Sequence, residues 1–69
     1  MKFTIKQARM LVGLSQKDMG ERLGISRSTY ISLENGEQYI RVDQMYKFSE
    51  ITGLPIRDIK FYEEVVDVK

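Results

Sequence analysis

Gly24-Ile25-Ser26 is the segment of this 69-residue sequence that most constrains the fold. Glycine ends helices readily because it adopts positive φ without steric cost, and serine caps the first turn of a helix through its side-chain oxygen. A helix stop, one apolar residue and a new helix start therefore follow one another directly. We expect two short, steeply crossed helices on either side of this three-residue turn.

Glycine stops and polar caps divide most of the chain into short helices. Apolar residues between these signals recur three and four positions apart, which is the spacing of one helical face. Helices are expected between Thr4 and Gly13, between Ser15 and Gly24, between Ser26 and Gly36, and between Val42 and Gly53. Leu54-Pro55 is expected to open a short fifth helix with Ile56 and Ile59 facing inward, because proline fits a first helical turn. The sequence thus predicts an all-α, compact five-helix domain.

The last residues differ in character from the rest. Segment 61–68 is rich in aromatic and β-branched residues, which favours a short strand or an extended arm over a helix. We therefore divide the chain into a domain at residues 1–61 and a tail at residues 62–69. The tail is a candidate dimerisation arm, because an exposed strand edge is normally paired or covered. A frayed chain end is the alternative.

The amino-acid composition narrows the chemistry that the chain can perform. It contains neither cysteine nor histidine, which removes disulfides and the usual zinc ligands. Nucleophilic catalysis would need serine, threonine or lysine activated by a carboxylate, in a domain too small to enclose a substrate pocket. We expect no enzymatic activity, no metal and no small-molecule cofactor. The sequence has no apolar run of a signal peptide and nothing near the ~20 apolar residues of a membrane span, so a cytoplasmic location is expected.

Charge is distributed unevenly along the chain, although the formal net charge is only +1. Residues 1–33 carry six basic and two acidic side chains, whereas residues 34–69 carry five basic and eight acidic ones. A basic half and an acidic half favour one face for a polyanion and another for a different contact. Ordinary solvated charge is the alternative interpretation.

A longer pattern surrounds the three-residue turn. It comprises Leu14-Ser15-Gln16, the segment from Leu23 to Tyr30, Leu33-Glu34-Asn35-Gly36, Val42-Asp43, Thr52-Gly53-Leu54 and Asp58-Ile59. This pattern covers approximately residues 4–60 and strongly resembles the helix-turn-helix of the phage-repressor-like family, also called the XRE or Cro-type family. The resemblance implies a lambda-repressor-like DNA-binding domain that regulates transcription.

The third expected helix corresponds to the recognition helix of that family, which enters the major groove with its first residues toward the base edges. Here those residues are Arg27 and Ser28, with Ser32 one turn further on the same side. Arginine can form a two-pronged contact with guanine, and serine can donate to or accept from several bases. Gln16 opens the preceding helix, where the matching glutamine of the family meets a phosphate and the edge of a base pair. The predicted DNA-binding residues are Gln16, Lys17, Arg27, Ser28, Thr29, Ser32, Asn35 and Arg41.

Some positions on these helices allow two interpretations. Thr29 is either a phosphate contact or an ordinary helix residue, and Ile31 either touches a thymine methyl group or is a tolerated surface residue. Ser15 and Ser26 are interpreted as helix caps rather than base readers. Gly20 stands where the family often has alanine, and a residue this small lets the second and third helices approach closely.

The loop after the third helix departs from the family pattern. Glu37 and Gln38 stand where the family often has basic residues, so Arg41 is the candidate that replaces their phosphate contact. Ile40 stands in place of a frequent proline. The loop is therefore either more mobile than in the family or anchored by this apolar side chain.

The resemblance also implies contacts away from DNA. In this family an arginine of the first helix pairs with the glutamate before Asn-Gly, so a partly buried Arg9–Glu34 ion pair is expected. Two copies on neighbouring half-sites are the usual route to useful affinity, so a homodimer is expected. The surfaces considered for it are Ile56, Ile59 and Phe61 on the expected fifth helix, and the tail from Tyr62 to Val68.

These features predict a small transcriptional regulator that binds double-stranded DNA sequence-specifically, as a dimeric repressor on a palindromic operator. We expect a compact phage-type or mobile-element repressor, or a small controller protein. The alternative is a protein-interaction module, such as an antitoxin that neutralises a partner protein. The acidic second half and the tail are the features that favour this alternative.

Overall fold

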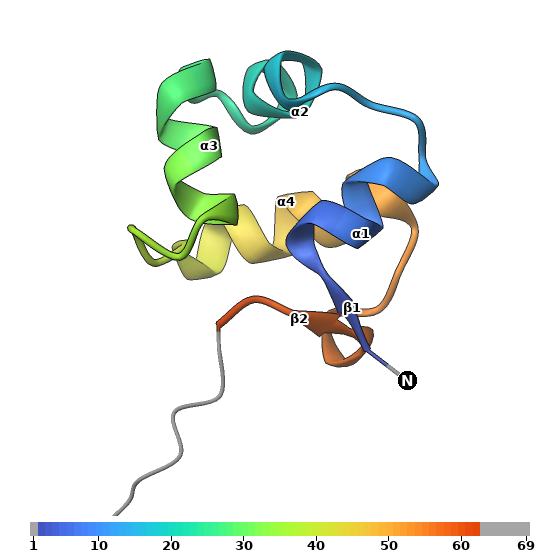
Figure 1. Cartoon of the computed structure of the whole chain (residues 1–69). Helices are drawn as coiled ribbons and strands as arrows, with labels where there is room; N and C mark the ends of the chain where they lie inside the picture. The colour runs from blue at the N-terminus through green and yellow to red at the C-terminus, as the bar shows by residue number, and fades with distance from the viewer. Residues whose placement is uncertain (1, 63–69) are drawn as a thin grey trace, which may run out of the picture.

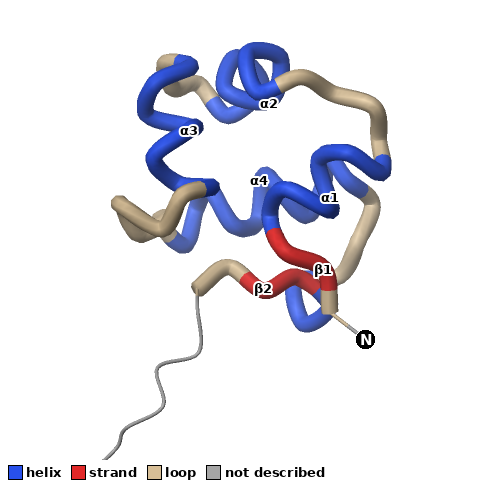
Figure 2. Tube along the Cα trace, viewed as in Figure 1, coloured by secondary structure: helices blue, strands red, loops and turns tan. Residues whose placement is uncertain are grey.

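The computed structural model describes residues 2–62, which form four short α-helices and a pair of two-residue strands (Figure 1). The helices are α1 (Ile5–Leu11), α2 (Gln16–Leu23), α3 (Arg27–Glu34) and α4 (Val42–Thr52). A 3₁₀ turn, η1 (Ile56–Asp58), leads into strand β2 (Ile59–Lys60), which pairs in parallel with β1 (Phe3–Thr4) (Figure 2). Within residues 2–62 no helix is both long and apolar enough to cross a membrane.

Local capping interactions set the boundaries of the first four helices where the sequence predicts them. Thr4 caps α1 by accepting from the backbone N–H of Gln7 at 3.0 Å, and the Gln7 side chain accepts in return from the Thr4 N–H at 2.9 Å. Gly53 ends α4 with φ at 74°, in the left-handed region that favours glycine. These contacts join residues that are close in sequence, so the sequence alone is sufficient to predict them.

The predicted fifth helix is wrong. After Pro55 the chain makes only the 3₁₀ turn, and Ile59 then adopts an extended conformation with φ at −115° and ψ at 128°. The reason is tertiary: Ile59 pairs with Phe3 across the two-stranded sheet, and ladder hydrogen bonds require extended backbone. Ile59 does face inward as predicted, with 4% of its surface exposed.

A short strand that the sequence does not predict at this position lies at Ile59–Lys60. Its partner is the N-terminal strand of the same chain. The fold is therefore mostly helical with a small strand pair, rather than all-α. The predictions of a strand, an arm or a dimer contact for residues 63–69 lie outside the described residues.

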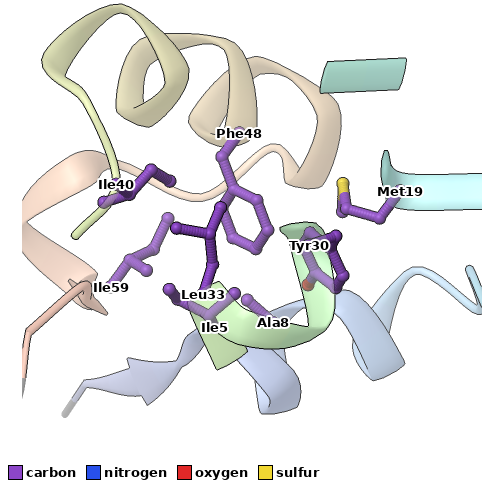
Figure 3. Packing of buried hydrophobic residues seen from close by; sticks show 8 residues of the cluster. All are labelled: Ile5, Ala8, Met19, Tyr30, Leu33, Ile40, Phe48 and Ile59. Atoms are coloured by element: carbon purple, nitrogen blue, oxygen red, sulfur yellow. The ribbon is translucent and has the colours of Figure 1, made fainter. Parts of the chain in front are cut away.

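The core is a single cluster to which all four helices contribute (Figure 3). Phe48 of α4 and Tyr30 of α3 are fully buried, and Met19 of α2 packs in the same cluster. The buried hydrophobic residues are Ile5, Ala8, Met19, Tyr30, Leu33, Ile40, Phe48 and Ile59. Since Ile40 lies in the loop between α3 and α4 and is only 3% exposed, the loop is anchored by this side chain. Of the two interpretations of Ile40, the anchor is the confirmed one.

The arrangement places α3 at one edge of the molecule, with α2 packed against it (Figure 1). The loop after α3 lies at the same edge, whereas the C-terminal end of α1 lies at the opposite one. One flank of α3 is thus held by the core and the other is turned away from it.

Candidate nucleic-acid interface

The turn between α2 and α3 has the geometry that its three residues predict. Gly24 ends α2 with φ at 76°, and the next backbone N–H, that of Ile25, donates to the carbonyl of Gly20 at 2.9 Å. Ser26 caps α3 by accepting from the N–H of Thr29 at 3.1 Å, and Ser15 caps α2 by accepting from the N–H of Asp18 at 3.0 Å. The two serines act as caps, as predicted, so α3 begins immediately after the turn.

Gly20 provides the close approach of α2 and α3 that its small size predicts. A Cβ atom at this position would lie 3.2 Å from the carbonyl oxygen of Ile25, 3.3 Å from that of Ser26 and 3.4 Å from Cβ of Tyr30. The first two distances are tighter than ordinary contacts and involve backbone atoms, which have little freedom to move. Gly20 therefore lets the two helices cross more closely than a larger side chain would allow.

The inner flank of α3 is apolar and its outer flank is polar. Tyr30 and Leu33 are buried, as the helical spacing predicts, whereas Arg27 and Ser28 are exposed. Thr29, Ile31 and Ser32 are half-buried. Because one flank of α3 packs in the core while the first residues of its other flank are exposed, α3 can enter a groove of a partner molecule and keep its packing.

The first turn of α3 gathers three hydroxyl groups. Ser26 Oγ donates to Thr29 Oγ1 at 2.9 Å and lies 3.3 Å from Ser28 Oγ. The Thr29 hydroxyl accepts in this pair, so its own proton stays available to an outside acceptor. Together with the Arg27 guanidinium, the start of α3 offers donors and acceptors of the kinds that read base edges.

The predicted Arg9–Glu34 ion pair is confirmed. Arg9 Nε donates to Glu34 Oε2 at 2.6 Å, and the two side chains are 11% and 3% exposed. Arg9 Nη1 also donates to the carbonyl of Leu14 at 2.8 Å, so the same guanidinium holds the loop before α2. The pair therefore ties α1 to the end of α3.

Sequence reasoning missed two further partners of Glu34. The Tyr30 hydroxyl donates to Oε2 at 2.6 Å, and the Gln16 side-chain amide donates to Oε1 at 3.1 Å. The spacing of four residues between Tyr30 and Glu34 is a signal for the first contact, because residues i and i+4 are neighbours on a helix. No local spacing indicates the second contact.

This network changes the ionisation of its members. Burial alone opposes ionisation of Glu34, but the hydrogen bonds from Arg9, Tyr30 and Gln16 outweigh it and hold the pKa of the carboxyl below its ordinary value. The pKa of Tyr30 is raised, first by burial and then by the adjacent carboxylate. The carboxylate is thus charged and the phenol neutral, so the phenol keeps the proton that it donates.

The hydrogen bond to Glu34 also fixes the orientation of the Gln16 amide. A carboxylate can only accept, so the nitrogen of the amide must face Glu34 and the carbonyl oxygen must face away from it. One amide proton is used in this bond, which leaves the second proton and the oxygen for another partner. Gln16 is half-buried, and its bond places the start of α2 beside the end of α3.

The eight predicted DNA-binding residues fall into two groups by accessibility. Lys17, Arg27, Ser28, Asn35 and Arg41 are exposed, whereas Gln16, Thr29 and Ser32 are half-buried. Seven of them lie on α2, on α3 or directly after α3. Arg41 is the exception, because it lies beyond the loop that follows α3.

Arg41 is engaged with a neighbour on its own segment. Its Nε and Nη2 donate to the carboxylate of Asp43 at 3.1 and 3.0 Å, and both side chains are largely exposed. The hydrogen bond and charge of this guanidinium hold the pKa of Asp43 below its ordinary value. A phosphate bound to Arg41 would have to share the guanidinium with that carboxylate.

Comparison with known proteins identifies the family. A helix-turn-helix family model matches residues 5–59, which span α1 to β2. The chain belongs to this helix-turn-helix family. The predicted resemblance to XRE-type regulators is thereby confirmed, and so is the absence of an enzymatic role, since the family is one of DNA-binding transcriptional regulators.

Two curated relatives match nearly the whole chain. An uncharacterized HTH-type transcriptional regulator of Methanocaldococcus jannaschii is 36% identical over 64 residues, covering 93% of this chain and 97% of the relative. An uncharacterized HTH-type transcriptional regulator of Archaeoglobus fulgidus is 28% identical over 64 residues, covering 93% of this chain and 90% of the relative. No solved structure gives a significant match.

Proposed function

We propose that this helix-turn-helix protein binds double-stranded DNA sequence-specifically and represses transcription as a dimer on a palindromic operator. The observation that carries the proposal is the outer flank of α3. It opens with the exposed Arg27 and Ser28, while Tyr30 and Leu33 hold the opposite flank in the core. Such a helix can enter the major groove without disturbing the fold.

The start of α3 supplies the base-reading groups in this proposal. Arg27 donates its two-pronged fork to the O6 and N7 atoms of a guanine, and Ser28 and Ser32 contact neighbouring base edges. Thr29 donates its free hydroxyl proton to a phosphate. Repression follows because a protein bound at an operator blocks access of RNA polymerase.

Phosphate contacts position the recognition helix. Gln16 and Lys17 at the start of α2 approach one strand of the DNA backbone, where the oriented amide of Gln16 donates its second proton. Asn35 and Arg41, after the other end of α3, approach a further stretch of backbone. Such contacts carry no sequence information themselves but fix the register of Arg27 on the bases.

Selection from a pool of random duplexes, followed by gel shifts of the selected sites at two salt concentrations, tests the proposal. We expect the selected sites to share a palindromic sequence, and binding to weaken at the higher salt concentration because counterions are released on phosphate contact. Equal affinity for selected and unselected duplexes would contradict sequence-specific binding. A reporter gene placed behind the selected site then tests repression.

A further inference from the structure

The first of the two dimer surfaces expected from the sequence, that of Ile56, Ile59 and Phe61, is largely used inside the protomer. Ile59 is buried and paired with Phe3. Phe61 stacks edge-on against Phe48, with ring centroids 5.8 Å apart. The homodimer that the proposed function requires therefore needs a surface other than this one, and the tail beyond Tyr62 lies outside the described residues.

Four large exposed side chains lie on the loop after α3, at the start of α4 and just after β2, and we call them the tyrosine patch. They are Tyr39 (80% exposed), Val42 (63%), Tyr46 (62%) and Tyr62 (42%). Val42 and Tyr46 are one turn apart on α4 and share a face of that helix. Large apolar side chains gathered on a small domain usually mark a contact surface.

The tyrosine patch rests on a fixed backbone. The rings of Tyr39 and Tyr62 pack edge-on with centroids 5.4 Å apart. The Tyr62 hydroxyl donates to the carbonyl of Ile40 at 2.6 Å, and the Ile40 side chain is buried in the core. Because aromatic rings held in this way lose little freedom on contact, a partner can bind them at low entropic cost.

The position of the tyrosine patch favours a second copy of the chain as the partner. The patch includes the loop that follows α3 and the start of α4, at the same edge of the molecule as α3 (Figure 1). A two-fold axis at this patch would bring the two α3 helices closer together than an axis at the opposite edge of the molecule would. Two recognition helices so placed can reach adjacent half-sites on one face of the DNA.

The charges on the tyrosine patch also permit contact between the patches of two copies of the chain. The charged side chains between Tyr39 and Tyr46 are Arg41 and Asp43, which neutralise each other at 3.0 Å. In a two-fold contact the patch of one protomer meets the same patch of the other, so a net charge on the patch would face an equal net charge. The neutral pair avoids this repulsion.

A second exposed apolar group, Met10, Leu11 and Val12 on and after α1, is placed differently. It lies at the edge of the molecule opposite to α3 (Figure 1). A two-fold axis there would hold the recognition helices at the far ends of the dimer. This group is therefore a matched control surface of similar chemistry.

We propose that the tyrosine patch is the homodimer interface, an inference that rests on the proposed function. Its side chains offer on the order of 500 Å² per protomer, below the ~800 Å² per partner of a stable complex. The dimer is accordingly weak in free solution and is completed on DNA, where two half-sites hold both copies in place.

Cysteine cross-linking tests the interface without DNA, because the chain contains no cysteine of its own. Single variants Val42→Cys and Tyr46→Cys report on the patch, and Met10→Cys reports on the control surface. With a short bismaleimide at high protein concentration, we expect at least one patch variant to form covalent dimers about tenfold faster than the control. Circular dichroism verifies that each variant is folded.

Cross-linking at Met10 that equals or exceeds that at both patch positions overturns the interface. If the patch variants cross-link but the protein binds no selected duplex, the interface stands and the proposed function fails. If DNA is bound, Tyr46→Lys is expected to reduce cooperativity between two half-sites about tenfold while affinity for an isolated half-site is kept. Unchanged cooperativity in Tyr46→Lys, with Leu11→Lys as the control, also overturns the interface.

Discussion

The side-chain amide of Gln16 donates to Glu34 Oε1 at 3.1 Å, which joins the first residue of α2 to the last residue of α3. Glu34 in turn is held by Arg9 and Tyr30 at 2.6 Å each. Gln16, which is proposed to touch DNA, is thus positioned by Glu34 of the buried Arg9–Glu34 ion pair. Changes to that ion pair should alter both folding and the DNA-facing surface.

Removal of Glu34 should be strongly destabilising. Glu34→Ala leaves the Arg9 guanidinium, whose side chain is 11% exposed, without its counter-charge. Breaking one partner of a buried pair costs about 3–5 kcal/mol, so the free energy of unfolding in urea should fall by about that amount. Asp43→Ala breaks the exposed Arg41–Asp43 pair, which water screens, and should leave the free energy of unfolding nearly unchanged. Similar losses in the two variants would contradict the special role of the buried pair.

Acid should weaken folding through the same carboxyl. The pKa of Glu34 lies below its ordinary value of 4.5 in the folded protein. Such a group stabilises the fold above its unfolded pKa, and the contribution is lost as pH falls through the folded pKa. We therefore expect the free energy of unfolding to decline as pH falls from 4.5, measured by urea titration at each pH.

Two variants measure how much of the acid-induced fall in the free energy of unfolding is due to Glu34. Glu34→Gln removes the titrating group, so its stability should depend less steeply on pH, although it is lower at neutral pH. Asp43→Asn removes an exposed carboxyl whose pKa is also lowered, by Arg41, but water screens this pair, so the slope should flatten less than in Glu34→Gln. An equally steep acid decline in Glu34→Gln and in the unaltered protein would refute the assignment.

A side chain at Gly20 should force α2 and α3 apart. A Cβ atom there meets backbone oxygens at 3.2 and 3.3 Å, and the branches of valine would extend further into them. Overpacking of this kind costs about 1–3 kcal/mol, so Gly20→Val should lower the melting temperature by several degrees. Gly13→Val is a control for valine at a glycine with open space, where only the positive φ of 72° is penalised. DNA affinity should fall in the Gly20 variant more than its stability loss explains, because the start of α3 shifts.

Arg27 should govern base preference without affecting the fold. Arg27→Ala removes an exposed side chain, so its unfolding curve should overlay that of the unaltered protein. If the guanidinium contacts a guanine through two hydrogen bonds, discrimination at one base pair should drop by about 1–3 kcal/mol. Gel shifts against single-base variants of the selected site measure this loss. The control is Arg57→Ala, since Arg57 is an exposed arginine that is distant in sequence from α3. If Arg27→Ala leaves the base preference unchanged, Arg27 does not contact the bases.

The local features of the site follow from the sequence alone. Ser15, Gly24 and Ser26 act on backbone groups within three or four residues of themselves, so their identities are sufficient to place the ends of α2 and the start of α3. Helical spacing likewise places Tyr30 and Leu33 in the core and Arg27 on the surface. Capping and periodicity work because the groups involved are neighbours in the chain.

Tertiary structure decided what depends on distant partners. Pro55 and Ile56 fit a helix start as well as they fit the observed turn, and only pairing of Ile59 with Phe3 selects an extended backbone. The bond between Gln16 and Glu34 and the burial of Ile40 likewise require packing of segments that are remote in sequence. No local pattern encodes these contacts, because their free energy is gained only when the whole core closes.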